Sequence, residues 1–126
     1  MKLEVGMYCR YNNFQNKIKI AKIKGIQKAD EVFRYDYISF DNDDGELETN
    51  IIKASYNIID ILEVGDIIRY RIDKVSLETK GYLTGVIDIT DEEMIESIKE
   101  DKNYHVLQIL TKEQFEEMSY KIKESR

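Results

Sequence analysis

The chain has 126 residues, of which 42% are hydrophobic and 35% charged, and its formal net charge is −6. This composition excludes a disordered chain, and a membrane protein is not expected because no apolar run is long enough to span a bilayer. The acidity disfavours generic binding to duplex DNA, which depends on Lys and Arg to neutralise phosphates. Cys9 is the single cysteine, which excludes an internal disulfide framework and favours a reducing cytoplasm.

The most informative feature of the sequence is a nine-residue phrase that occurs twice. LEVGMYCRY occupies residues 3–11 and LEVGDIIRY occupies residues 62–70, with Leu, Glu, Val, Gly, Arg and Tyr at matching positions. Units as small as half of this chain bury little surface and are individually marginal. We therefore expect two related units, residues 1–62 and 63–126, that pack together.

The first unit has the pattern of a small all-β unit. Strands are predicted at residues 7–11, 17–26, 32–40, 46–52 and 58–62, with a hairpin turn at 43–45 and a single helical turn at 53–57. In the second strand, Ile18 and Ile20 have one parity and Ile23 has the other, which predicts a bulge near Ala21. Five short strands with a helical turn before the last is the order of SH3-like small barrels, so fold-level analogy predicts that fold.

The second unit opens with the same strand and then departs from the pattern. Strands are predicted at residues 67–72, 82–90 and 104–110, and capping boxes at 90–93 and 111–114 predict helices near 91–100 and 112–124. The expected fold class is mainly β with α. It consists of duplicated SH3-like small β-barrel units, the second truncated and finished by two helices.

No stretch has the spacing of a catalytic, cofactor or metal site. Residues 41–48, DNDDGELE, resemble a cation loop, but an EF-hand needs glycine at its sixth position and glutamate at its twelfth, which here are Glu46 and Ile52. The Asp-Gly pair favours a hairpin turn instead. His105 has no second ligand at a suitable spacing, and Cys9 lies on an apolar strand face, which favours a core position. We expect no enzyme activity, no cofactor and no metal.

Two groups of charged residues are candidate binding surfaces. The acidic group suits a basic surface such as the nucleic-acid channel of another protein, and its members are Asp41, Asp43, Asp44, Glu46, Glu48, Asp91, Glu92 and Glu93. The basic group lies near aromatic residues and suits a phosphate backbone with bases stacked on the rings, and its members are Arg10, Lys17, Lys19, Lys22 and Lys24. A turn and a helix N-terminus also explain most of the carboxylates, and a solvated strand face explains the lysines.

Three segments of the chain read as recurring phrases: LEVGMYCRYNNFQNKIKIAKI, IIKASYNIIDILEVGD and ILTKEQFEEMSYKI. Together they resemble segments of short proteins encoded by prophages of low-GC Firmicutes such as clostridia. The resemblance covers both ends and the middle of the chain, and these phrases carry no known active site. It implies a small accessory protein acting in a bacterial cytoplasm during phage carriage or infection. Many such proteins antagonise host immunity, for example as anti-CRISPR proteins.

These observations lead to one expected function and two alternatives. The expected function is that of a non-enzymatic phage accessory protein that binds and inhibits a bacterial defence component, above all a CRISPR nuclease, through the acidic group. One alternative is a nucleic-acid-binding small barrel that uses the basic group. The other is a sponge for a cyclic-nucleotide immune signal. Aromatic residues in excess of what such small cores can bury would favour a homodimer.

Overall fold

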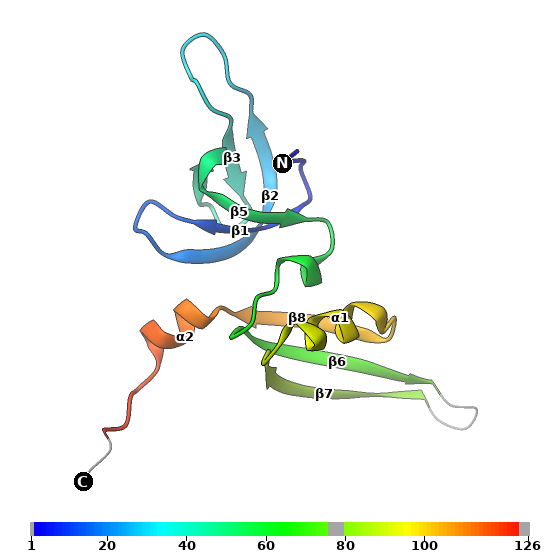
Figure 1. The fold of residues 1–126 in the computed structure, drawn as a ribbon. Coiled ribbons are helices and arrows are strands. Elements are labelled where there is room, and N and C mark those ends of the chain that lie inside the picture. Colours follow the sequence, from blue (N-terminus) through cyan, green and yellow to red (C-terminus); the bar gives the residue numbers. More distant parts are fainter. Residues whose placement is uncertain (1, 76–79, 124–126) are drawn as a thin grey trace.

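The computed structural model describes residues 2–75 and 80–123, which form two antiparallel sheets with separate hydrophobic cores (Figure 1). One sheet occupies the upper part of Figure 1 and the other the lower part, with the short 3₁₀ turn η2 (Ile58–Ile61) between them. The expected class, mainly β with two helices, is confirmed. Within the described ranges, every helix is too short or too polar to cross a bilayer.

The first sheet has five strands in the order β4-β3-β2-β1-β5. The strands are β1 (Tyr8–Asn12), β2 (Ile18–Gln27), β3 (Tyr37–Phe40), β4 (Gly45–Leu47) and β5 (Ile51–Ser55). The 3₁₀ turn η1 (Glu48–Asn50) connects β4 to β5. The core consists of Cys9, Tyr11, Ala21, Ile23, Ile38 and Phe40. Because β4 and β5 are the two unpaired ends of the order, the sheet is not a closed barrel.

The second sheet has three strands in the order β7-β6-β8, which are β6 (Ile67–Val75), β7 (Lys80–Asp88) and β8 (Tyr104–Leu110). Helix α1 (Glu92–Glu100) packs on one face of this sheet together with η2. The core between them consists of Ile59, Leu62, Ile68, Ile89, Ile95 and Ile98. Helix α2 (Lys112–Met118) follows β8 and contacts β2 of the first sheet.

The repeated phrase adopts the same backbone geometry in both units. Gly6 and Gly65 have positive φ angles of 96° and 99°, a conformation that side chains other than glycine rarely adopt. The Gly6 N–H donates to the carbonyl of Ile23 at 2.9 Å, and the Gly65 N–H donates to that of Ile89 at 2.8 Å. Strands β1 and β6 are each the middle strand of an antiparallel trio, and both have a register shift between the repeated Arg and Tyr. The repeat is therefore a structural repeat of one turn and one strand.

The bulge expected near Ala21 is absent, because β1 and β2 pair in one unbroken register that passes through Ala21. The irregularity lies further along β2, between Ile23 and Gly25, where the strand pairs with β3. The apolar residues of β2 change from one face of the strand to the other because both faces are partly covered. Ala21 and Ile23 face the first core, whereas Ile20 lines a groove beside β8.

Two further local expectations in the first unit are wrong. Residues 32–36 do not form the start of β3, because the carboxylate of Asp30 accepts the N–H groups of Val32 and Phe33, at 2.8 Å each, and holds a turn there. Residues 53–55 belong to strand β5 rather than to a helical turn. The helical turns lie on either side of β5, as η1 and η2.

Residues 58–62 were expected to form a fifth strand, and residues 58–61 form η2 instead. The side chain of Asn57 accepts the N–H of Ile59 at 3.1 Å, which caps the turn at its start. Ile59 and Leu62 pack in the core of the second unit. That core therefore begins before residue 62, where the sequence placed the boundary between the units.

The two helices of the second unit lie where the sequence predicted them, with different ends. Helix α1 is capped by Asp91, whose carboxylate accepts the N–H of Met94 at 2.9 Å, rather than by Thr90. The predicted capping box of α2 is present, with Thr111 and Gln114 bonded reciprocally at 3.1 and 3.0 Å. Helix α2 ends at Met118, and Ser119 is extended, so the helix is shorter than the predicted range 112–124, whose last residue lies outside the described residues.

Candidate functional site

The two units meet at a buried arginine. Arg10 of β1 is fully buried, and its guanidinium forms an ion pair with Asp66, which is also fully buried in the turn of the second repeat. Its Nε donates to the carbonyl of Ile61 at 3.0 Å. Glu63 and Glu113 complete the group, with carboxylate oxygens 3.6 and 3.8 Å from the guanidinium. The first repeated strand therefore inserts its arginine into the second repeated turn.

Further contacts hold the carboxylates of Asp66 and Glu63 in place at this junction. The carboxylate of Asp66 accepts the N–H groups of Glu63 at 2.9 Å and Lys112 at 3.3 Å. Burial acts to raise the pKa of Glu63, but the cations of Arg10, Lys53 and Lys112 together hold it below its usual value. Glu63 is therefore ionised at neutral pH. The junction is a structural ion cluster, and Arg10 is not part of an exposed basic surface, contrary to the sequence-based expectation.

The acidic hairpin and the lysine strand, which the sequence offered as alternative surfaces, lie against each other. The Nζ of Lys19 is 3.4 Å from the Asp44 carboxylate, and that of Lys24 is 3.2 Å from the Asp43 carboxylate. The carboxylate of Asp41 accepts the backbone N–H of Lys22 at 3.1 Å. The opposite charges screen one another, so neither the hairpin nor the lysine strand presents a surface with charges of a single sign.

The remaining residues of these two groups are dispersed. Glu46 is only 6% exposed and accepts a hydrogen bond from Asn50 at 2.9 Å, so it is not a surface contact as the sequence suggested. Glu48 lies half-buried in η1. Lys17 forms an ion pair with Glu117 of α2. Lys22 lies over the ring of Tyr8, with its Nζ 5.2 Å from the ring centroid.

Helix α1 carries the acidic surface with the fewest cationic partners. Its exposed acidic side chains are Glu92, Glu93, Glu96 and Glu100, on the side of the helix away from the buried Ile95 and Ile98. In the described part of the chain, the ion pairs of α1 are limited to Lys99 with Asp60, at 2.6 Å. Like charges four residues apart cost a helix a few tenths of a kcal/mol per pair. Glu96 repels Glu92 and Glu100 in this way, whereas Glu92 and Glu93 lie in the first turn, where the helix dipole favours negative charge.

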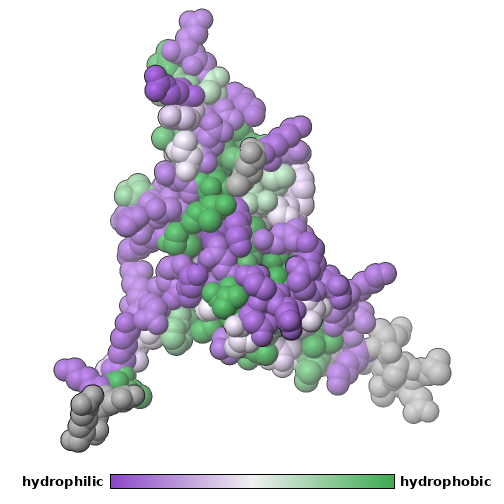
Figure 2. Space-filling model, viewed as in Figure 1, coloured by the Kyte–Doolittle hydropathy of each residue, from purple (hydrophilic) through white to green (hydrophobic). Residues whose placement is uncertain are grey.

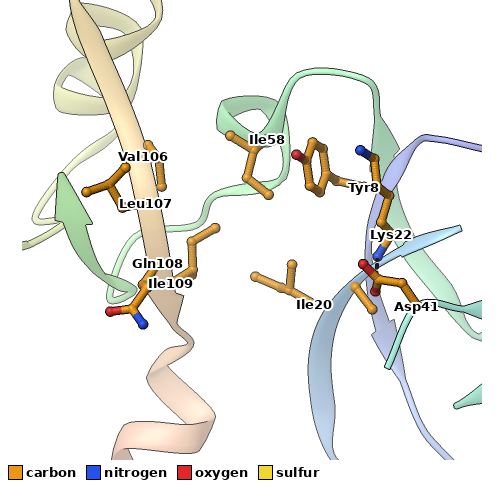
Figure 3. A pocket seen from close by; sticks show the side chains of 10 residues that line it. Tyr8, Ile20, Lys22, Asp41, Ile58, Val106, Leu107, Gln108 and Ile109 are labelled. Atoms are coloured by element: carbon orange, nitrogen blue, oxygen red, sulfur yellow. Dashed lines mark hydrogen bonds between the residues drawn. The ribbon is translucent and has the colours of Figure 1, made fainter. Parts of the chain in front are cut away.

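A groove of about 300 Å³ runs between the two units, and Figure 3 shows its walls. Tyr8, Ile20, Lys22 and Asp41 line it from the first sheet, and residues 106–109 of β8 line it from the second. Ile58 of η2 lies at one end, between Tyr8 and β8. The walls are apolar except where Lys22, Asp41 and Gln108 approach the rim, which suits a hydrophobic side chain of a partner better than a phosphate.

Sequence reasoning missed an aromatic pocket at the far end of the first sheet. Phe33, Tyr35, Tyr37 and Leu47 line a hollow of about 320 Å³ and are each more than 40% exposed. Figure 2 shows hydrophobic residues interrupting the hydrophilic surface in this upper part of the molecule. The alternating aromatic residues were assigned to a strand, which made them candidates for the core. Phe33 and Tyr35 lie in the turn before β3, and Tyr37, at the start of β3, is also exposed.

The groups whose pKa is most strongly raised lie in the cores. Burial raises the pKa of Cys9 to about 12 and that of Tyr104 to about 12, and it raises the pKa of Tyr11 still further. All three remain protonated at neutral pH, so Cys9 is a packing residue rather than a nucleophile. Among the described residues, no group of three His, Cys, Asp or Glu side chains is arranged to hold a metal ion.

Comparison with known proteins found no matching family model, no similar curated protein and no similar solved structure.

Proposed function

We propose that the protein is a non-enzymatic binding protein that inhibits a bacterial defence component, and that a CRISPR nuclease is the first target to test. The observation that carries this proposal is the acidic row on α1, which has few cations near it and faces away from the core. Nucleases hold their substrates in basic channels, and a rigid helix of carboxylates complements such a surface in charge. The net charge of −6 favours the same kind of partner.

The proposed contact surface keeps the α1 part of the acidic group expected from the sequence and leaves out the hairpin part. The hairpin carboxylates Asp43 and Asp44 are paired with lysines, so attraction to a basic partner would first have to break those contacts. The α1 row avoids this cost. The groove between the units lies beside β8 and offers an apolar contact to the same partner, because hydrophobic anchors supply most binding energy and charges mainly steer.

We further propose that residues 2–55 form an open SH3-like unit. Five strands in the order β4-β3-β2-β1-β5, with a 3₁₀ turn immediately before β5, support this assignment. SH3 domains bind proline-rich segments in aromatic-lined grooves, so the pocket of Phe33, Tyr35 and Tyr37 is a second contact candidate. The fold analogy describes the scaffold and does not identify the partner.

Nucleic-acid binding remains the alternative proposal, with less support. Four of its five candidate cations are already engaged: Arg10 in the junction, Lys17 with Glu117, Lys19 with Asp44 and Lys24 with Asp43. A phosphate backbone would have to displace these carboxylates. The sponge alternative gains little from the inter-unit groove, whose walls are mainly apolar. A second pocket is lined by Lys17 and Lys19, but Glu113 and Glu117 line it too, and these carboxylates would repel a cyclic nucleotide.

The test is a paired affinity purification from a clostridial host. One bait is the unchanged protein, and the other carries Glu→Gln at positions 92, 93, 96 and 100, which removes the charge of α1 but keeps its helix propensity. A matched control carries Asp41→Asn, Asp43→Asn and Glu48→Gln, which neutralises the hairpin region instead. The proposal predicts that a defence nuclease is retained by the unchanged protein and by the control and is lost from the α1 variant. Recovery of nucleic acid alone, with a steep dependence on salt, would support the alternative.

A further inference from the structure

Strand β7 forms one edge of the second sheet, and its outer side is open. It pairs with β6 over nine consecutive residue pairs without a bulge, and within the described residues no strand pairs with its other side (Figure 1). Between Gly81 and Ile87 it has no charged residue and no proline. Natural proteins normally protect such an edge with charges, proline, a bulge or a covering element.

The side chains of β7 are exposed on both faces of the sheet. Tyr82 and Val86 are 71% and 63% exposed on the face away from α1, and Leu83 and Ile87 are 46% and 38% exposed on the α1 side. Hydrophobic residues lie along the lower edge of the molecule in Figure 2, where β7 runs. A strand with free backbone groups and apolar side chains on both faces is suited to pairing with another strand.

The hydrogen-bond pattern shows which residues of β7 present free backbone groups. The N–H of Ile89 donates to the carbonyl of Asp66 at 2.8 Å, in the same register as the β6–β7 pairs. Antiparallel bonds alternate along a strand, so odd-numbered residues of β7 bond to β6. The N–H and C=O groups of Tyr82, Thr84 and Val86 therefore point outward.

We propose that β7 pairs antiparallel with β7 of a second copy of this chain, with the two-fold axis at Thr84. In this register the residues with free backbone groups pair with one another. Thr84 lies opposite Thr84 of the second copy, and Tyr82 lies opposite Val86 of the second copy. It overlaps all nine residues of the strand and creates a continuous six-stranded sheet. Aromatic with β-branched and Thr with Thr are favourable cross-strand pairs.

The same register matches large side chains to glycines on the α1 side. Leu83 comes opposite Gly85 of the second copy, over which the ring of Tyr70 lies, and Ile87 comes opposite Gly81 of the second copy. A Cβ added at Gly81 meets no atom within 4 Å, so there is space for the isoleucine. A shift by two residues loses these matches: in one direction it sets Leu83 against Ile87 of the second copy, and in the other it sets Leu83 against Leu83 of the second copy.

The interface is small, and this sets its expected strength. Nine residues at about 3.4 Å each give an edge of about 30 Å, which buries less than the area typical of stable dimers. The dimer is therefore concentration-dependent, with a dissociation constant of about 10 µM to 1 mM. The two-fold pairing is closed, so it ends at the dimer and does not form filaments.

The register makes a specific test possible, because residue 84 of one copy lies directly opposite residue 84 of the other. Sedimentation velocity of the full chain over a concentration series should show monomer and dimer in exchange. Thr84→Lys and Thr84→Glu should each raise the dissociation constant about tenfold or more, because like charges then lie directly opposite. An equimolar mixture of the two variants should dimerise at least as well as the unchanged protein. Circular dichroism and thermal unfolding of each variant establish that it is folded.

Three outcomes would overturn the proposal. The unchanged protein could remain monomeric throughout the concentration series, or the two variants, shown to be folded, could dimerise as well as the unchanged protein. The third is a mixture of the variants that fails to recover dimer, which would exclude the two-fold axis at Thr84. Thr84→Val, which keeps the backbone donor and the β-branched shape, is the matched control and should dimerise normally.

Discussion

The guanidinium of Arg10, in the first copy of the repeated phrase, forms a buried ion pair with Asp66, in the second copy. Both side chains are fully buried, and Glu63 and Glu113 bring two more carboxylates to the same cation. The residue that matches Arg10 in the second copy is Arg69, which is exposed on the open face of the second sheet. The two copies thus have the same local geometry and different roles.

Removing the buried cation should destabilise the protein strongly. Arg10→Met leaves Asp66 without its partner in a buried site, and breaking such a pair typically costs about 3–5 kcal/mol. Arg69→Met removes the matching arginine from an exposed site and should change stability by about 0.5 kcal/mol or less. Urea unfolding of both variants measures the difference. Equal effects at the two positions would show that the junction does not hold the units together.

The stability of the protein should fall in acid, partly because of Glu63. Its folded-state pKa lies below the ordinary value of 4.5, so its stabilising contribution is complete above that value and is lost as the pH falls through the folded-state pKa. The melting temperature should be nearly constant from neutral pH down to about 5 and should then decrease.

The matched variant for this pH dependence is Glu63→Gln. It should be less stable at neutral pH and should show a shallower decrease below 4.5, while Asp60, whose pKa is lowered mainly by Lys99, still contributes to the decrease. An unchanged slope in the Gln variant would mean that the junction cations do not act on Glu63.

Tyr11 should contribute through its hydroxyl as well as its ring. The hydroxyl donates to Asp44 at 2.6 Å and accepts from Asn42 at 2.8 Å, and the ring stacks on Phe40 with centroids 4.1 Å apart. Tyr11→Phe keeps the stack and loses the hydrogen bonds, which should cost about 1 kcal/mol. Tyr35→Phe, at a surface position, is the control and should have little effect in the same urea titration.

The lysine strand offers a test between the two main functional proposals. Changing Lys17, Lys19, Lys22 and Lys24 together to Ser should leave inhibition of a nuclease nearly intact, because these lysines mainly pair with neighbouring carboxylates. If the protein binds nucleic acid instead, the log–log slope of affinity against salt becomes shallower by about 0.9 for each lost duplex contact. Fluorescence anisotropy of labelled DNA at several salt concentrations measures that slope.

The repeat could be predicted from the sequence because it is a local feature. Glycine at the fourth position of LEVG allows a positive φ angle, and this angle is found at both Gly6 and Gly65. The capping box of α2 is local in the same way, since Thr111 and Gln114 are three residues apart. Such features depend on neighbours in the chain, and the pattern of the sequence contains them.

The errors have physical causes that a short window of sequence does not contain. A short apolar run such as residues 58–61 fits either a strand or a helical turn, and the cap from Asn57 decides for the turn. The isoleucines of β2 change parity because a second unit covers the other face of the strand. The pair of Arg10 and Asp66 joins residues 56 positions apart, so it depends on how the two units pack.

The most direct test of the central claim is a DNA-cleavage assay with purified clostridial CRISPR nucleases, to which the protein is added in stoichiometric amounts. The account predicts that the unchanged protein inhibits cleavage by a target nuclease and that Glu→Gln at positions 92, 93, 96 and 100 weakens inhibition about tenfold or more. The hairpin control, with Asp41→Asn, Asp43→Asn and Glu48→Gln, should inhibit nearly as well as the unchanged protein. Inhibition that is equally strong in the folded α1 variant, or no inhibition of any nuclease tested at a large excess of the protein, would contradict the account.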